Sequence, residues 1–184
     1  MELDETRNDL SIRGKNGTGF LLAAFVIWSI ITLIFLQSIE IHQKNIYMLF
    51  STGLMFPLSV GMSTFIKADW KLKNNPFGNL GLYLNLAQLV YFPIIFWAII
   101  KSPNEAILFF AIITGAHFFP YGWFYNAKPY YIMAPVISVG VLFLGLYLSG
   151  ENLWLVPFSM AIFLLCLILW LYLDYKRKIL KKLI

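Results

Sequence analysis

Six stretches of the chain contain no Asp, Glu, Lys or Arg, and shorter polar segments separate them. They hold 17 to 21 residues each and cover 19–39, 46–66, 80–100, 106–125, 132–148 and 153–173. About 20 helical residues cross a hydrocarbon core of roughly 30 Å, and a helix satisfies its own backbone hydrogen bonds in lipid. The pattern therefore predicts an all-α integral membrane bundle of six transmembrane helices.

Composition supports this interpretation. Hydrophobic residues make up 60% of the 184 residues and charged residues only 12%, more apolar surface than a water-soluble domain of this size can bury. The expected organisation is an N-terminal tail (1–18), one transmembrane domain (19–173) and a basic C-terminal tail (174–184). Apolar residues recur every four positions after residue 174, which indicates that the last helix continues as an interfacial helix.

The basic residues predict the orientation. Of the 14 Lys and Arg residues, 12 fall on the same side of the six stretches, and only Lys44 and Lys101 fall on the other. Both termini are therefore expected in the cytoplasm. The formal charge of +5 follows from this bias, so we expect anionic lipids at the cytoplasmic face as partners rather than nucleic acid. The residues expected at the lipid interface are Lys67, Trp70, Lys71, Lys73, Lys176, Arg177 and Lys178.

Polar side chains gather at one depth. Counting inward from the expected cytoplasmic ends places several of them at most about 12 Å inside that boundary. We predict that they line a ligand cavity in the cytoplasmic half of the bundle, where kinks at Pro57, Pro93 and Pro120 hold the helices apart. The predicted lining residues are Trp28, Ser59, Asn85, Gln88, Tyr91, His117 and Tyr121.

Each of these groups also has a structural interpretation. His117 lies three residues before Pro120 and could satisfy the backbone of a kinked helix. Asn85 and Gln88 could serve as hydrogen bonds between helices. Ser59 and Ser63 stand four residues apart, as in a packing seam of small residues.

The expected chemistry is limited. No acidic or basic residue lies within a span, which disfavours ion antiport. The chain carries no zinc-protease, nucleophile-elbow or phosphate-loop motif, and Cys166 is its single cysteine. We therefore expect no catalytic residue, no metal site and no cofactor.

Two segments resemble an uncharacterised family. They read KADWKLKNNPFGNLG at 67–81 and GAHFFPYGWFY at 115–125. In these segments the chain is similar to a domain of unknown function found in small multi-pass membrane proteins of bacteria, mostly Gram-positive. The resemblance implies a multi-pass protein of the bacterial plasma membrane and carries no activity.

Three functions remain open. The first is a binding or transport module for a small neutral or aromatic ligand, motivated by the polar layer and the kinked spans. The second is a structural or accessory protein that modulates a membrane protein partner. The third is an intramembrane enzyme with His117 as its base, for which no second titratable group is visible in the sequence.

Overall fold

The computed structural model describes residues 2–148 and 150–183, with side chains as far as Lys181. Three residues lie outside the described part of the chain: Met1, Ser149 and Ile184. Met1 belongs to the expected N-terminal tail and Ile184 to the expected C-terminal tail. The elements in chain order are α1 (Leu3–Arg13), η1 (Lys15–Gly17), α2 (Thr18–Phe35), α3 (Ile41–Thr52), α4 (Met55–Phe65), α5 (Gly78–Leu89), α6 (Phe92–Lys101), α7 (Ala106–His117), α8 (Phe119–Phe124), α9 (Lys128–Tyr147), η2 (Gly150–Trp154) and α10 (Leu155–Leu183).

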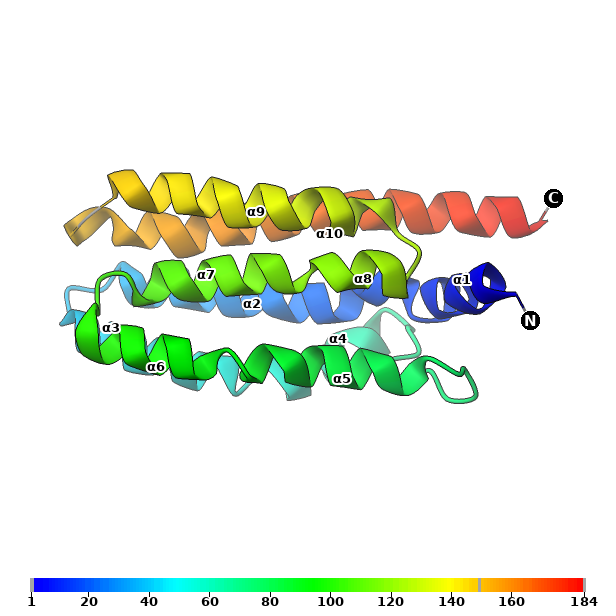
Figure 1. Ribbon diagram of the computed structural model, residues 1–184, viewed down its shortest axis with the longest axis horizontal. Helices are drawn as coiled ribbons and strands as arrows, with labels where there is room; N and C mark the ends of the chain where they lie inside the picture. The colour runs from blue at the N-terminus through cyan, green and yellow to red at the C-terminus, as the bar shows by residue number, and fades with distance from the viewer. Residues whose placement is uncertain (1, 149, 184) are drawn as a thin grey trace.

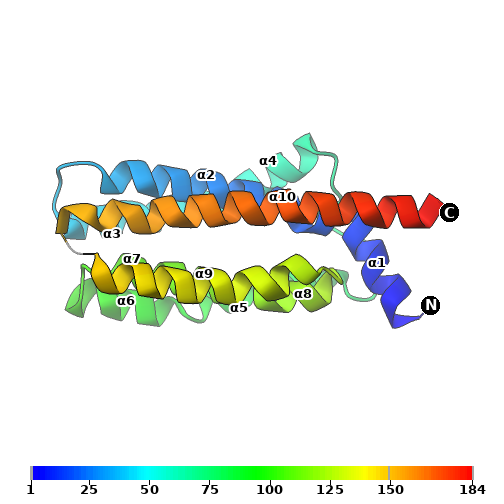
Figure 2. The ribbon, with the colours of Figure 1, turned by 90° about the horizontal axis from the view of Figure 1, so that it is seen from above.

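The helices form an elongated bundle of two layers. One layer holds α2 between α10 and the α3–α4 pair, and the other holds α7 and α8 between α9 and the α5–α6 pair (Figures 1 and 2). The layers pack together where α10 meets α9 and α7. Both chain ends lie at the same end of the bundle, which we call the terminal end (Figure 1).

The expected all-α architecture is confirmed. Five helical segments are long and apolar enough to cross a membrane, and the α3–α4 pair makes a sixth if it is counted as one span. The first two membrane-spanning segments are offset from the predicted stretches 19–39 and 46–66, because α2 ends at Phe35 and α3 begins at Ile41. The Lys44 ammonium donates a hydrogen bond of 2.9 Å to the Phe35 carbonyl, which closes the last turn of α2 with a residue of the next helix.

Three of the apolar stretches are interrupted near a proline, and among the described residues only the α3–α4 pair is bent by more than 40°. A gap of one or two residues separates α3 from α4, α5 from α6, and α7 from α8, and α3 and α4 meet at 46°. Each break lies just before Pro57, Pro93 or Pro120, which lack the N–H that would continue the helix. Backbone bonds tighten there to three-residue spacing, as from Gly53 to Phe50 and from Phe118 to Gly115.

Two further prolines within the apolar stretches, Pro135 and Pro157, do not break their helices. The α9 helix runs through Pro135 without interruption, and Pro157 lies in the first turn of α10. A first-turn residue needs no intrahelical N–H partner, so Pro157 is compatible with a continuous helix.

The expected N-terminal tail contains structure that the sequence did not indicate. The α1 helix lies across the terminal end of the bundle (Figure 2). Lys15, Asn16 and Gly17 then adopt left-handed backbone angles that turn the chain into α2. Gly17 is required at this turn, because a Cβ there would lie 2.7 Å from the Tyr125 ring.

Asn16 organises a buried polar cluster beside this turn. Its amide nitrogen donates to the Leu171 carbonyl and to the Asp174 carboxylate, both at 3.0 Å. Its carbonyl oxygen accepts a 2.8 Å bond from the Tyr130 hydroxyl, and Ser11 donates to its side-chain oxygen. Asn16 is fully buried, so one residue joins the N-terminal segment to α9 and α10.

The α10 helix continues to Leu183, which confirms the helical continuation expected after residue 174; its position at the membrane interface stays a prediction. It leaves the bundle at the terminal end as a straight extension (Figure 1).

We predict that Asn16→Ala lowers the free energy of unfolding by about 1–3 kcal/mol, because it leaves buried partners without hydrogen bonds. Thermal unfolding of the purified protein, followed by intrinsic tryptophan fluorescence, measures the change. The control Asn152→Ala removes an exposed asparagine and should leave the unfolding temperature unchanged. Equal unfolding temperatures for the wild type and Asn16→Ala would contradict a stabilising role for the cluster.

We also predict that the terminal end faces the cytoplasm. Single cysteines at Lys181 and at Asn152, in a Cys166→Ser background, stand at opposite ends of the bundle and are both exposed. A membrane-impermeant thiol reagent applied to whole cells should label Asn152→Cys and leave Lys181→Cys unlabelled. Labelling of Lys181→Cys from outside would reverse the orientation.

Candidate functional site

A cavity of about 830 Å³ lies between the two layers, in the half of the bundle that ends at the terminal end. Its walls come from α2, α5, α7 and α8, from the α3–α4 break and from the loop that joins α4 to α5. Gly53 of the α3–α4 break and Phe118 of the α7–α8 break line it, and Leu89 and Phe92 line it on either side of the α5–α6 break. The cavity therefore occupies the space that broken helices leave open.

Aromatic rings form much of the wall. Near the middle of the bundle the Trp28 and Phe110 rings stack at 5.1 Å between centroids, and Phe92 meets Phe110 edge to face at 6.4 Å. Toward the terminal end, the Tyr125 ring stacks on those of Tyr121 and Tyr130 at 6.1 and 6.2 Å. These surfaces suit contact with a flat or apolar ligand.

Polar groups interrupt the aromatic wall at one level. Gln88 of α5 donates a 3.3 Å hydrogen bond to the Thr114 hydroxyl of α7. Asn85, one turn earlier on α5, donates to the Gly81 carbonyl at 2.9 Å. Each of these bonds occupies an amide N–H, so the amide oxygens remain able to accept hydrogen bonds from a ligand. The His117 ring lies 3.4 Å from the Tyr121 hydroxyl.

The structure brings five of the seven predicted residues to the cavity wall. They are Trp28, Asn85, Gln88, His117 and Tyr121.

Ser59 and Tyr91 do not line the cavity, contrary to the prediction. Ser59 is fully buried on α4, one turn from buried Ser63, whose atoms would contact a Cβ placed on Gly19 of α2. It belongs to the packing seam between α2 and α4, and its hydroxyl has no hydrogen-bond partner among the described residues. Tyr91 stands at the α5–α6 break with 48% of its surface exposed. The break before Pro93 rotates Tyr91 off the cavity-facing side of α5.

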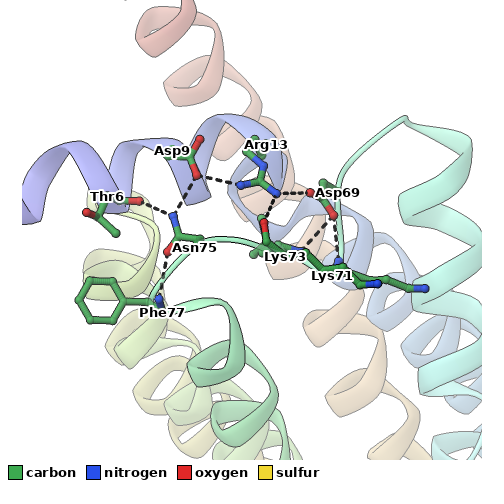
Figure 3. Close-up of polar contacts among 9 residues, drawn as sticks. Thr6, Asp9, Arg13, Asp69, Lys71, Lys73, Asn75 and Phe77 are labelled. Carbon is green, nitrogen blue, oxygen red and sulfur yellow. Dashed lines mark hydrogen bonds and ion pairs between the residues drawn. The ribbon is translucent and has the colours of Figure 1, made fainter. Parts of the chain in front are cut away.

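The loop from α4 to α5, residues 66–77, closes the terminal end of the cavity, and we call it the strap. Arg13 of α1 holds it in place (Figure 3). The Arg13 guanidinium donates hydrogen bonds of 2.6 Å to the Asp69 carboxylate and 2.7 Å to the Lys73 carbonyl. Asn75 adds bonds to the Thr6 carbonyl and the Asp9 carboxylate, at 3.1 and 2.9 Å. The strap is therefore tied to α1 at two points.

Charge and hydrogen bonding act together at Asp69. Partial burial raises the pKa of this carboxyl, but the hydrogen bonds from Arg13 and from the Leu72 and Lys71 amides outweigh burial and hold the pKa below its ordinary value of 3.8. The hydrogen bond to Asp69 in turn raises the pKa of Arg13. The ion pair is intact across the neutral range.

Most residues expected at the lipid interface lie at the terminal end with exposed or half-exposed side chains. They are Lys67, Trp70, Lys71, Lys73, Lys176 and Arg177. Trp70, Lys71 and Lys73 also line the cavity, a role that the sequence did not indicate.

Lys178 differs from the other expected interface residues. Its ammonium pairs with Asp174 at 2.8 Å and donates to the Ser11 hydroxyl and the Tyr125 carbonyl at 2.8 and 3.0 Å. These bonds occupy it within the Asn16 cluster, so it does not serve as a lipid-facing charge. Its position one turn after Asp174 on a continuing helix directs it back toward α1.

Other wall residues were missed because aromatic residues are common in apolar stretches and do not by themselves indicate a cavity. Phe92, Phe110, Tyr125 and Tyr130 fall into this group. The cluster of aromatic residues around Pro120 was the only visible signal for any of them.

Comparison with known proteins adds a family. A model of DUF7010, a family of unknown function, matches residues 3–174. The chain belongs to this family. No curated protein and no solved structure matches it. The DUF7010 match includes α1, the strap and the whole cavity wall, so these parts belong to one family domain.

We predict that the attachment of the strap depends on the charge of Asp69. Because its pKa is lowered in the folded protein, the stabilising contribution is present above pH 3.8 and is lost as pH falls through the lower folded value. At pH 7, Asp69→Asn should reduce the hydrogen-exchange protection of the strap about two- to five-fold, since both partners are about one-third exposed.

Hydrogen exchange with mass spectrometry, corrected for intrinsic rates, measures the protection of peptides covering 66–77. Glu105→Gln removes an exposed carboxylate in the loop before α7 and serves as the control. If Asp69→Asn and the wild type exchange alike at pH 7, the ion pair does not hold the strap.

Proposed function

We propose that this DUF7010 chain is a ligand-binding module of the membrane, which holds a small molecule with a neutral or aromatic body between α2, α5, α7 and α8. The observation that carries the proposal is the cavity itself. Its volume of about 830 Å³ falls within the roughly 300–1,000 Å³ of small-molecule sites. Such sites combine an apolar wall with a few converging polar groups.

The wall has this composition. Phe20 and Phe92 offer partly exposed aromatic rings, and the stacked pair of Trp28 and Phe110 is buried in the wall. The amides of Asn85 and Gln88 offer hydrogen bonds from α5. A body that stacks on the rings and meets one or two amides would satisfy both sides. Water in the cavity can form hydrogen bonds with the amides but makes no favourable contact with the aromatic rings. A ligand with an apolar body can make both kinds of contact.

The chemistry of the wall favours binding over catalysis. Among the described residues that line the cavity, none is Asp or Glu, and the imidazole of His117 has the Tyr121 hydroxyl as its neighbour. A general base needs a partner that orients it or accepts its charge. We therefore place His117 as a hydrogen-bonding group for the ligand.

We propose the bacterial plasma membrane as the setting, with the terminal end in the cytoplasm. The support is the 12-to-2 distribution of basic residues and the apolar length of the helices. In this orientation the cavity lies in the cytoplasmic half of the bilayer.

A cavity-filling substitution tests the proposal. A panel of small aromatic and amphiphilic compounds is screened for stabilisation of the wild type, and the best compound is tested on Ala24→Trp. Ala24 lies on the cavity wall, so an indole there should abolish the thermal shift. The control is Ala87→Trp, which adds the same side chain to an exposed position on α5 outside the wall.

A second variant, His117→Ala, should weaken binding of the same compound about three- to ten-fold, the loss expected for one hydrogen bond. Its unfolding temperature without ligand should stay within a few degrees of the wild type. A compound that stabilises Ala24→Trp as strongly as the wild type binds elsewhere, and the proposal then fails.

A further inference from the structure

The charge of the cavity wall is one-sided. Lys71 and Lys73 are the only charged residues on the wall in the described part of the chain, and both lie on the strap. The Lys71 ammonium lies 5.0 Å from the centre of the Trp70 ring. Neither lysine forms an ion pair with a described acid, because the nearest one in sequence, Asp69, is bound by Arg13. Lys71 and Lys73 therefore have no ion-pair partner among the described residues at the terminal end of the cavity, and the Asp9–Arg13–Asp69 group behind the strap carries one net negative charge.

The rest of the cavity becomes apolar with distance from the strap. Past the level of Asn85 and Gln88, the wall ends at Trp28, Phe92 and Phe110. The molecule that fits this gradient has an anionic group at one end and an apolar body at the other.

The volume of the cavity has room for one acyl chain. A methylene group occupies about as much space as a water molecule, roughly 30 Å³ in the liquid. A cavity of about 830 Å³ then holds about 28 such groups. One chain of 16 to 18 carbons with its head group fits within this number.

The cavity also has a side that faces lipid. Phe56 of α4 and Leu82, Leu86 and Leu89 of α5 line it, and each has about half or more of its surface exposed. No residue of α5, all of which the structure describes, is buried, and α5 does not pack closely on α4. In a bilayer this seam between α4 and α5 opens toward the acyl chains, from which an amphiphile can enter sideways.

We propose that the cavity binds a single-chain anionic amphiphile, with its acidic head at Lys71 and Lys73 and its chain between α2 and α5. This inference rests on the proposed function and names its ligand class. An anionic amphiphile departs from the neutral or aromatic ligand expected from the sequence, because Lys71 and Lys73 line the cavity. The alternative role of Lys71 and Lys73, contact with the anionic bilayer surface, predicts no effect inside the cavity.

The test uses the full-length protein in nanodiscs of zwitterionic phosphatidylcholine. Four photoreactive 16-carbon probes, each with a diazirine near the end of the chain, are compared: a carboxylate, a monophosphate ester, a neutral alcohol and a trimethylammonium cation. After illumination, mass spectrometry measures labelling of the peptides that contain Trp28, Phe92 and Phe110. Comparison of the carboxylate and the phosphate identifies the type of acidic head.

The expected result is half-saturation of cavity labelling by at least one anionic probe at about ten-fold lower concentration than by the alcohol or the cation. The double variant Lys71→Gln/Lys73→Gln should remove this difference, since two partly exposed charge contacts together correspond to about ten-fold in affinity. The matched control Lys67→Gln/Lys176→Gln removes two exposed lysines outside the wall and should preserve the difference.

Two results would overturn the inference. If the alcohol labels the cavity as well as the anions, and the double variant changes nothing, the ligand is not anionic and the proposed function still stands. If no probe labels the cavity while a compound from the screen still loses its thermal shift in Ala24→Trp, the chain-like ligand is wrong and binding remains. If no probe labels the cavity and no compound loses its thermal shift in Ala24→Trp, the proposed function is rejected as well.

Discussion

The missing amide hydrogen of proline determines where this bundle is open. A helix in lipid depends on its own hydrogen bonds, so each proline in mid-span leaves a carbonyl without its usual partner. Pro57, Pro93 and Pro120 occur in the second, third and fourth spans, and each one follows a break between two helices. The three breaks meet at the cavity. On the other side of the bundle, α9 and α10 are unbroken and pack together, which gives the molecule a continuous half and an interrupted half.

The terminal end compensates for the interrupted half with polar bonds. The Asn16 cluster joins the N-terminal segment to α9 and α10, and the Arg13–Asp69 pair joins it to the strap. These contacts lie at the expected membrane boundary, where charged groups are less costly than at the bilayer centre. The segment before the first span therefore works as a brace. The loosely packed α5 is connected to it through the strap and to α7 through the Gln88–Thr114 hydrogen bond.

The two walls of the cavity differ in how tightly they are packed. The wall formed by α2, α7 and α8 is buried and stacked, with Trp28 only 2% exposed. The opposite wall is α5, whose side chains face the cavity or the surroundings. A rigid wall with specific polar groups and a wall with few packing contacts suit a site that a ligand enters from the side. The link between the strap and α5 connects the charged mouth of the cavity with the helix that covers it.

The sequence alone determined the membrane architecture, because hydrophobic length and charge bias act locally along the chain. Six apolar stretches predicted the helices, the prolines predicted three of the weak points, and depth counting brought Trp28, Asn85, Gln88, His117 and Tyr121 to one level. Depth counting could not decide which face of a helix each residue occupies after a break, so Ser59 and Tyr91 were placed wrongly. The brace, the strap and the second role of Lys71 and Lys73 depend on contacts across more than 50 positions, as between Arg13 and Asp69. Only the tertiary structure decides such contacts, because hydrogen bonds between distant segments leave no periodic pattern in the sequence.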